Sequence, residues 1–246
     1  MNNISKAKII ILLAILLSCN AIPVIAHAQD ESCPDSLEDY MYIKQEKSVI
    51  AKFIESTMRG VGLKGGSRLT DYINKQNKLV SARPLNSMYL MFDIEVDDRF
   101  GHNVWTIEPP RDMSDHVVIY LHGGSYKYNF LTPHWLFITE IINQLKVRVV
   151  APDYPLAPEY NATHVFDLLL KVYKNVIQET NPKKVSIIGD SAGGGMTLAL
   201  AQLLQEKGLP QPDQLIMLSP CVDVTLTNPD IVEVDQNDPI LNTGSR

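Results

Sequence analysis

A serine flanked by small residues is the feature of this sequence that most directly suggests chemistry. Gly189-Asp190-Ser191-Ala192-Gly193 fits the pattern G-x-S-x-G and directly follows a short apolar stretch, Val185–Ile188. Between a strand and a helix, this pentapeptide forms a sharp turn that exposes the serine hydroxyl as a nucleophile. A phosphate-binding loop is one alternative, although no lysine stands at its characteristic position. A glycine-rich turn without any chemistry is another.

A second glycine-rich segment could complete such a site. His122-Gly123-Gly124-Ser125-Tyr126 directly follows another apolar stretch, His116–Leu121. Acyl transfer creates an oxyanion, which needs N–H donors that are already in place. A glycine-rich loop after the third strand, together with the N–H group that follows the nucleophile, supplies such donors. The two motifs together therefore indicate acyl transfer through Ser191.

The motifs, taken in order, resemble those of the hormone-sensitive-lipase-like branch of the α/β-hydrolase fold, a family that includes bacterial esterases. The resemblance runs from about Val104 to the last residue. Besides the two motifs above, it includes Tyr154-Pro155-Leu156-Ala157-Pro158-Glu159, Leu218-Ser219-Pro220-Cys221-Val222-Asp223 and Asp238-Pro239-Ile240-Leu241. It implies a mostly parallel sheet with helices on both faces, an N-terminal helical cap and a small-molecule acyl ester as substrate.

The resemblance also implies roles for individual residues. Ser191 is the expected nucleophile, and the expected oxyanion hole is built from the loop of Gly123, Gly124 and Ser125 together with Ala192. The expected structural residues of the two motifs are His122, Gly189, Asp190 and Gly193. Two positions depart from the family pattern. Ser125 replaces a third glycine, which restricts φ, and Cys221 replaces a tryptophan, which removes a large packing group.

The base and the acid of a catalytic triad are not evident. In this fold they follow the serine in the chain, whereas all six histidines precede Ser191. The following acids in recognisable motifs, Asp223 and Asp238, are not the catalytic acid of the family. We therefore expect a fragment or the product of a truncated gene, with C-terminal strands and a helix missing and with very weak turnover. A base supplied by His134 or His164, or a non-catalytic protein, are the alternatives.

The N-terminus reads as a secretory signal peptide, Met1–Ala28. Lys6 and Lys8 precede the apolar stretch Ile9–Leu17, and Ala26-His27-Ala28 fits a cleavage site. The apolar stretch is too short for a membrane span, which takes about 20 residues. We therefore expect cleavage after Ala28, a secreted or cell-envelope protein, and no stable membrane span in the mature chain.

Two other readings of the N-terminus stay open. Leu16-Leu17-Ser18-Cys19 resembles a bacterial lipobox, which would make Cys19 a lipidation site, and an uncleaved anchor is also conceivable. We favour simple cleavage because the stretch after Cys19 stays apolar through Ile25, whereas a lipoprotein tether is usually polar. Cys33 and Cys221 would then remain, either as a disulfide in the exported protein or as free thiols.

The mature chain divides into an N-terminal helical cap segment, residues 29–87, and an incomplete hydrolase core, residues 88–246. Alternating apolar residues predict strands from Met88 to Ile94 and from Asn103 to Ile107, joined by the turn Asp97–Gly101. After this hairpin the pattern alternates between short apolar strands and amphipathic helices, which predicts a parallel sheet. The further strands are expected at His116–Leu121, Val147–Ala151, Val185–Ile188 and Gln214–Leu218, and the helices at Pro133–Lys146, Ala162–Gln178 and Ala192–Lys207.

Composition excludes several classes of function. The net charge is −6 over 246 residues, and it becomes −8 when the signal and its two lysines leave. With no basic patch, a nucleic-acid partner is not expected. We expect no metal and no cofactor, since metal-ligand spacings are absent and the histidines are scattered. Asn161-Ala162-Thr163 fits a glycosylation sequon, but Asn161 is better explained as a helix cap.

The combined prediction is an exported serine hydrolase for carboxylic esters with small or medium acyl chains. An amidase or deacylase on the same scaffold is an alternative, because the serine turn does not separate esters from amides. The oligomeric state is left open.

Overall fold

The computed structural model describes Ser56, residues 83–179, Pro182 and residues 184–238. The chain divides into two compact units, one of residues 1–66 with 232–246 and one of residues 67–231. The signal segment, Cys33 and nearly all of the expected cap segment lie outside the described residues. The fold below is that of the second unit.

A six-stranded sheet forms the centre of this unit, in the order β1-β2-β4-β3-β5-β6. Its strands are β1 (Asp93–Asp97), β2 (Val104–Glu108), β3 (His116–Leu121), β4 (Arg148–Pro152), β5 (Lys184–Asp190) and β6 (Gln214–Leu218). The first two strands pair antiparallel, and β3 to β6 run parallel to one another. This arrangement confirms the expected α/β-hydrolase fold with a mostly parallel sheet.

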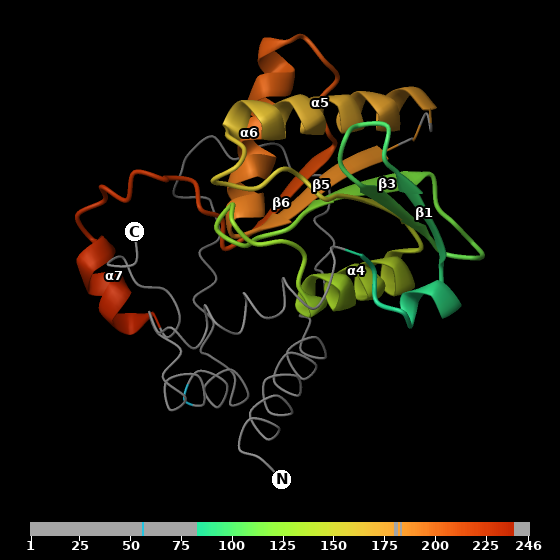
Figure 1. The fold of residues 1–246 in the computed structure, drawn as a ribbon, viewed down its shortest axis with the longest axis horizontal. Coiled ribbons are helices and arrows are strands. Elements are labelled where there is room, and N and C mark those ends of the chain that lie inside the picture. Colours follow the sequence, from blue (N-terminus) through green and yellow to red (C-terminus); the bar gives the residue numbers. More distant parts are fainter. Residues whose placement is uncertain (1–55, 57–82, 180–181, 183, 239–246) are drawn as a thin grey trace, which may run out of the picture. The chain divides into compact units, whose positions relative to one another are not determined.

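Helices cover both faces of the sheet. Figure 1 shows α5 (Ala162–Glu179) and α6 (Ala192–Glu206) on one face and α4 (Thr132–Leu145) on the opposite face. Strand residues alternate between two apolar clusters because successive side chains point to opposite faces. Leu121 and Ile187 pack with α5 and α6, whereas Tyr120 and Ile188 belong to the cluster that contains the residues of α4.

The start of α5 and the end of α4 show two different helix caps. Asn161 accepts hydrogen bonds from the N–H groups of Thr163 and His164 at 3.1 and 3.4 Å, which confirms its capping role at α5. The last turn of α4 stops at Lys146, which lies in the left-handed region with φ 54°. The helix α7 (Ile231–Asn237) was not expected from the sequence.

The prediction for residues Met88 to Met91 was wrong. Met88–Leu90 forms a 3-10 helix, and the first strand begins only at Asp93. The N–H group of Phe92 donates to the carbonyl of Met88 at 2.9 Å, which places these two side chains on the same side of the turn. Both are buried while Leu90 is exposed, so the apolar residues follow a spacing of four rather than the alternation of a strand.

The register of the parallel strands creates the site. Leu121 of β3 pairs with Gly189 of β5, and Asp190 pairs with Leu218 of β6. Parallel strands end at the same edge of a sheet, so the segments that follow β3, β5 and β6 meet there. The two motifs singled out in the sequence are therefore adjacent in space.

Candidate active site

Ser191 occupies a strained turn between β5 and α6. Its φ of 51° and ψ of −117° lie outside the regions that ordinary residues favour. The Ser191 N–H group donates to the carbonyl of Leu218 at 2.9 Å, and its carbonyl accepts from the N–H groups of Cys221 and Gly195 at 2.9 and 3.1 Å. Bonds on both sides hold the backbone in this conformation, as expected for a nucleophile elbow.

Close packing explains one of the glycines of the elbow. A Cβ atom at Gly193 would collide with the carbonyl oxygen of Leu121, the last residue of β3. No side chain therefore fits at this position, and the start of α6 can approach the end of β3. This approach brings the elbow beside the loop that follows β3.

That loop turns back on itself directly after Gly124. Gly124 has φ 128°, and Ser125 and Tyr126 both lie in the left-handed region with φ 53° and 61°. The N–H groups of Lys127 and Tyr128 both donate to the carbonyl of Gly124 at 3.0 Å. A left-handed conformation costs a residue such as Ser125 about 1 kcal/mol. The loop is therefore strained at the position where Ser125 replaces a glycine of the family pattern.

Three of the expected oxyanion donors are available to a ligand. In the part of the chain that the structure describes, no group accepts a hydrogen bond from the N–H of Gly124, Ser125 or Ala192. Gly123 differs, because its N–H group donates to Oδ1 of Asp190 at 3.0 Å. The Gly123 N–H group is therefore occupied by Asp190, and the candidate oxyanion donors are the N–H groups of Gly124, Ser125 and Ala192.

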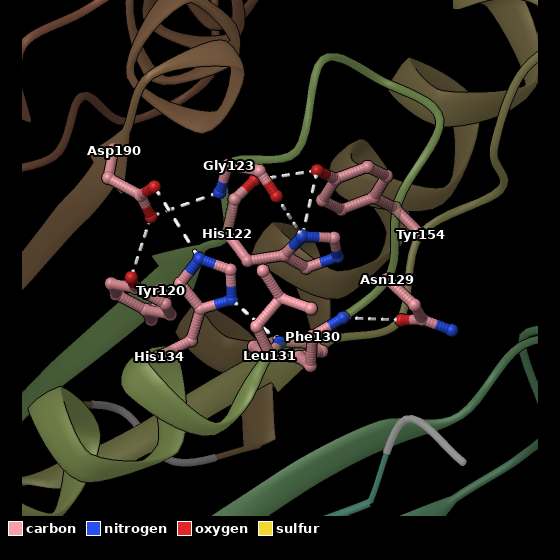
Figure 2. Close-up of polar contacts among 9 residues, drawn as sticks. All are labelled: Tyr120, His122, Gly123, Asn129, Phe130, Leu131, His134, Tyr154 and Asp190. Atoms are coloured by element: carbon pink, nitrogen blue, oxygen red, sulfur yellow. Dashed lines mark hydrogen bonds and ion pairs between the residues drawn. The ribbon is translucent and has the colours of Figure 1, made fainter. Parts of the chain in front are cut away.

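Asp190 joins the elbow to three other elements (Figure 2). Its Oδ1 also accepts a 2.7 Å hydrogen bond from the hydroxyl of Tyr120 on β3, and its Oδ2 lies 3.6 Å from Nε2 of His134 on α4. Burial by itself would raise the pKa of Asp190, but His134, the Tyr120 hydroxyl and the Gly123 N–H group outweigh it and lower the pKa. Asp190 is thus a carboxylate at neutral pH.

His122 is fully buried under the same loop. Its Nδ1 donates to the carbonyl of Gly123 at 2.7 Å, and its ring stacks on Tyr154 with centroids 4.2 Å apart. Burial lowers the pKa of His122 to about 3, so the ring is neutral at physiological pH. A buried neutral ring held in this way packs against the loop, and the structural role expected for His122 stays a prediction.

None of the histidines in the described residues contacts the Ser191 hydroxyl. His164 lies at the start of α5, where its Nδ1 is 2.8 Å from Oδ1 of Asn161. His116 lies 2.8 Å from the hydroxyl of Ser186, but this pair belongs to the opposite ends of β3 and β5 from Ser191. The side chain of His134 reaches the elbow, but its contact there is with Asp190.

A largely apolar pocket of about 490 Å³ opens beside the elbow and the loop. Tyr126, which follows Ser125, lines it together with Gly195 of the first turn of α6. Phe166 and Cys221 contribute further apolar surface. The pocket touches Tyr126 of the loop motif and Gly195, two residues beyond the serine pentapeptide, so it can hold part of a small apolar ligand near Ser191.

Among the described residues, no group of three or more His, Cys, Asp or Glu side chains is arranged to hold a metal ion. No described helix is both long and apolar enough to cross a bilayer. Cys221 forms no disulfide with another described residue, and Cys33, the partner considered above, lies outside the part of the chain that the structure describes.

Sequence reasoning missed three contacts of the site: those of the Tyr120 and Tyr154 hydroxyls, and that of His134, which was considered only as an alternative base, with Asp190. The Tyr154 hydroxyl donates to the carbonyl of His122 at 2.6 Å. The hydrophobic pattern assigns Tyr120 and Tyr154 to the apolar core. It gives no information about the partners of their hydroxyl groups. His134 is the third residue of α4, and a side chain at this position commonly reaches back to cap the helix. Its position in the expected helix could therefore have indicated a polar role for His134.

Comparisons with known proteins agree with this geometry. A family model described as "alpha/beta hydrolase fold" matches residues 118–245. An esterase of Acinetobacter venetianus is 32% identical over 127 residues, which are 51% of this chain and 42% of that protein. The solved structure of an esterase/lipase from an uncultured bacterium has a TM-score of 0.64 and 25% identity, and the match covers 76% of this chain and 64% of that one.

A solved esterase of the bacterial hormone-sensitive lipase family shares the fold, with a TM-score of 0.65 and 24% identity over 81% of this chain and 67% of that one. This chain spans less than half of the length of the curated relatives it matches, with 42%, 44% and 33% of three of them covered. From its matched family model, its sheet and its serine elbow, the chain belongs to the α/β-hydrolase fold family.

Proposed function

We propose that the chain is part of an exported serine hydrolase that cleaves carboxylic esters of small or medium acyl chains through an acyl-enzyme on Ser191. The observation that carries this proposal is the pairing of Leu121 with Gly189, which sets the strained Ser191 beside the free N–H groups of Gly124 and Ser125. A nucleophile next to unpaired backbone donors is the arrangement that acyl transfer requires.

The proposed reaction begins with attack of the Ser191 oxygen on the ester carbonyl carbon. The carbonyl electron pair moves to its oxygen, which accepts hydrogen bonds from the N–H groups of Gly124, Ser125 and Ala192. When this intermediate collapses, the bond to the alcohol oxygen breaks and the acyl group remains on Ser191. Water then releases the acid and restores the serine.

Both halves of this reaction need a base. The Ser191 proton must leave as the bond to carbon forms, and the departing alcohol must gain a proton. Because no described histidine contacts Ser191, we propose that residues outside the described set supply this function in the working enzyme. Without such a base, acylation of Ser191 and turnover of the ester should both be slow.

The apolar pocket supports the size of the proposed substrate. Its volume of about 490 Å³ suits a short or medium chain, and its walls at Tyr126, Phe166 and Cys221 offer few polar partners. Cys221→Trp would fill part of this space. We expect this variant to lose activity toward longer p-nitrophenyl esters more than toward the acetate, while equal losses would remove the pocket from the substrate site.

Acylation can be tested directly on the 246-residue chain. After incubation with excess p-nitrophenyl acetate, intact-mass and peptide mass spectrometry should find one acetyl group on the Ser191 peptide. Ser191→Ala should remove this adduct. Ser114→Ala, a change in the exposed loop before β3, should keep it.

Two results would separate the alternatives. A folded chain without any Ser191 adduct would support a non-catalytic protein. Equal acylation by the matching p-nitroanilide would support an amidase or deacylase. Slow, Ser191-dependent acylation by the ester alone supports the esterase.

The proposed export has its own test. N-terminal sequencing of the protein released by the native host should begin at Gln29, or at Cys19 if the chain is lipidated. An exported protein that retains Met1 would contradict both forms of the proposal.

A further inference from the structure

The two ring nitrogens of His134 face two different partners. Nδ1 accepts a 2.9 Å hydrogen bond from the N–H group of Leu131, directly before α4, and Nε2 lies 3.6 Å from Oδ2 of Asp190 (Figure 2). Because a backbone donor occupies Nδ1, the neutral ring carries its proton on Nε2. The helix start thus aims an N–H donor at the Asp190 carboxylate.

The second oxygen of that carboxylate holds the loop beside Ser191. Oδ1 of Asp190 accepts hydrogen bonds from the Gly123 N–H group at 3.0 Å and from the Tyr120 hydroxyl at 2.7 Å. The side chains of His134 and Asp190 are only 12% and 26% exposed, so water competes weakly for these contacts. A carboxylate with partners on both oxygens cannot rotate freely.

We propose that His134 is a positioning residue for the loop His122–Tyr126, called the oxyanion loop below. His134 orients the Asp190 carboxylate that binds the Gly123 N–H group of this loop. Gly123 directly precedes Gly124 and Ser125, whose N–H groups are the candidate oxyanion donors. Loss of the bond at Gly123 frees the backbone that sets the direction of those donors. Only the catalytic consequence of this role rests on the function proposed above.

The two contacts of His134 can be separated by substitution. In His134→Asn the amide oxygen stands as many bonds from Cβ as Nδ1 does, so the cap on Leu131 is kept and Asp190 is out of reach. In His134→Gln the amide nitrogen stands where Nε2 does, so the contact with Asp190 is kept and the cap is lost. If His134 only caps the helix, His134→Asn should disturb the Gly123 amide less than His134→Gln does. If His134 orients Asp190, His134→Gln should disturb it less.

His164 provides a matched control. It occupies the same third position of α5, and its Nδ1 lies 3.4 Å from the backbone nitrogen of Asn161 and 2.8 Å from its Oδ1. His164→Gln therefore perturbs a comparable helix start on the other face of the sheet. It should leave the Gly123 amide unchanged.

Amide hydrogen exchange of Gly123, followed by NMR in the full chain, is the primary measurement. We expect exchange about tenfold faster in His134→Asn and close to the unsubstituted rate in His134→Gln. In an Asp190→Asn background, His134→Asn should add nothing, since the proposed effect passes through the carboxylate. Where acylation of Ser191 by p-nitrophenyl acetate is observed, His134→Asn should lower its maximal rate more than its half-saturating ester concentration.

The proposal would be overturned if the Gly123 amide exchanged faster in His134→Gln than in His134→Asn, or if its rate did not change in His134→Asn. If His134→Asn does not fold, long-range proton–nitrogen NMR of the unsubstituted chain decides the matter. A proton on Nε2 of His134 supports the proposal, and a neutral ring with its proton on Nδ1 refutes it. Absence of Ser191 acylation would count against the esterase and leave the exchange result for His134 intact.

Discussion

The hydroxyl of Tyr154 donates a 2.6 Å hydrogen bond to the carbonyl oxygen of His122, and the two rings stack with an angle of 14° between their planes. Both residues are buried. The contact ties the segment after β4 to the first residue of the oxyanion loop. It makes a tyrosine of the family-like segment Tyr154–Glu159 part of the support of the active site.

Tyr154→Phe should therefore affect stability and the site together. Removal of the hydroxyl leaves the buried His122 carbonyl without this donor, at a cost of about 1–3 kcal/mol in the free energy of unfolding. Tyr173→Phe is the matched control, because the Tyr173 hydroxyl donates to the carbonyl of Pro210 at 3.0 Å, away from the loop. Urea denaturation should show a loss in both variants. Exchange of the Gly123 amide should accelerate only in Tyr154→Phe, and equal acceleration in both would contradict the link.

Gly193→Ala tests the approach of α6 to β3. The added methyl group would meet the carbonyl oxygen of Leu121, so we expect a loss of about 1–3 kcal/mol and displacement of the oxyanion loop. Gly101→Ala is the control: Gly101 has φ 82° but nothing within 4 Å of a Cβ atom. It should lower thermal stability through backbone strain alone and keep Ser191 acylation. Full acylation in Gly193→Ala would show that the two elements need not approach so closely.

Two groups, the buried His122 and the partly buried Asp153, should affect the stability of the chain in opposite directions as the pH falls. His122 has its pKa lowered to about 3 by burial, so the unfolded chain takes up its proton first, and stability falls as the pH drops from about 6.5 to about 3. Burial raises the pKa of Asp153 to about 6, partly offset by a hydrogen bond with Asn129. Asp153 therefore adds stability that is present below about pH 4 and lost as the pH rises to about 6.

Single substitutions should expose each contribution. In Asp153→Asn, urea denaturation should show stability falling on acidification below pH 6.5, with a slope of up to about 1.4 kcal/mol per pH unit. In His122→Asn, which keeps a donor near the Gly123 carbonyl, stability should instead rise between about pH 6 and pH 4. The same pH dependence in both variants would show that neither group titrates as its burial indicates.

The edge strand β6 should promote association of the chain. Among the described strands it pairs only with β5, and Ile216 and Leu218 are each 39% exposed. An apolar edge of this kind offers unpaired backbone groups to another molecule. Ile216→Lys should therefore lower hydrophobic-dye binding and light scattering. Leu90→Lys, at a residue that is 89% exposed on a short helical turn, should change them less. An equal effect of both would point to general apolar exposure rather than to the strand edge.

The sequence was a reliable guide where one local pattern dominates. The bounds of β3 and β6 agree with the predicted ones, and α4, α5 and α6 differ by a residue or so, because their apolar periodicity is strong. The strand expected at Met88 failed because a pattern of buried and exposed residues over four positions fits a helical turn as well as a strand. The antiparallel start of the sheet followed from turn residues between Asp97 and Gly101.

The sequence by itself determined the family, the serine turn and the type of glycine-rich loop that faces it, because these depend on short motifs whose backbone conformation only a few residues allow. Tertiary structure decided which donors face the site. The pairing of β3 with β5 places Asp190 against Gly123, and α4 then brings His134 to the same carboxylate. These residues lie far apart in the chain, and their contact depends on the strand register and the position of a packed helix, which no local pattern encodes.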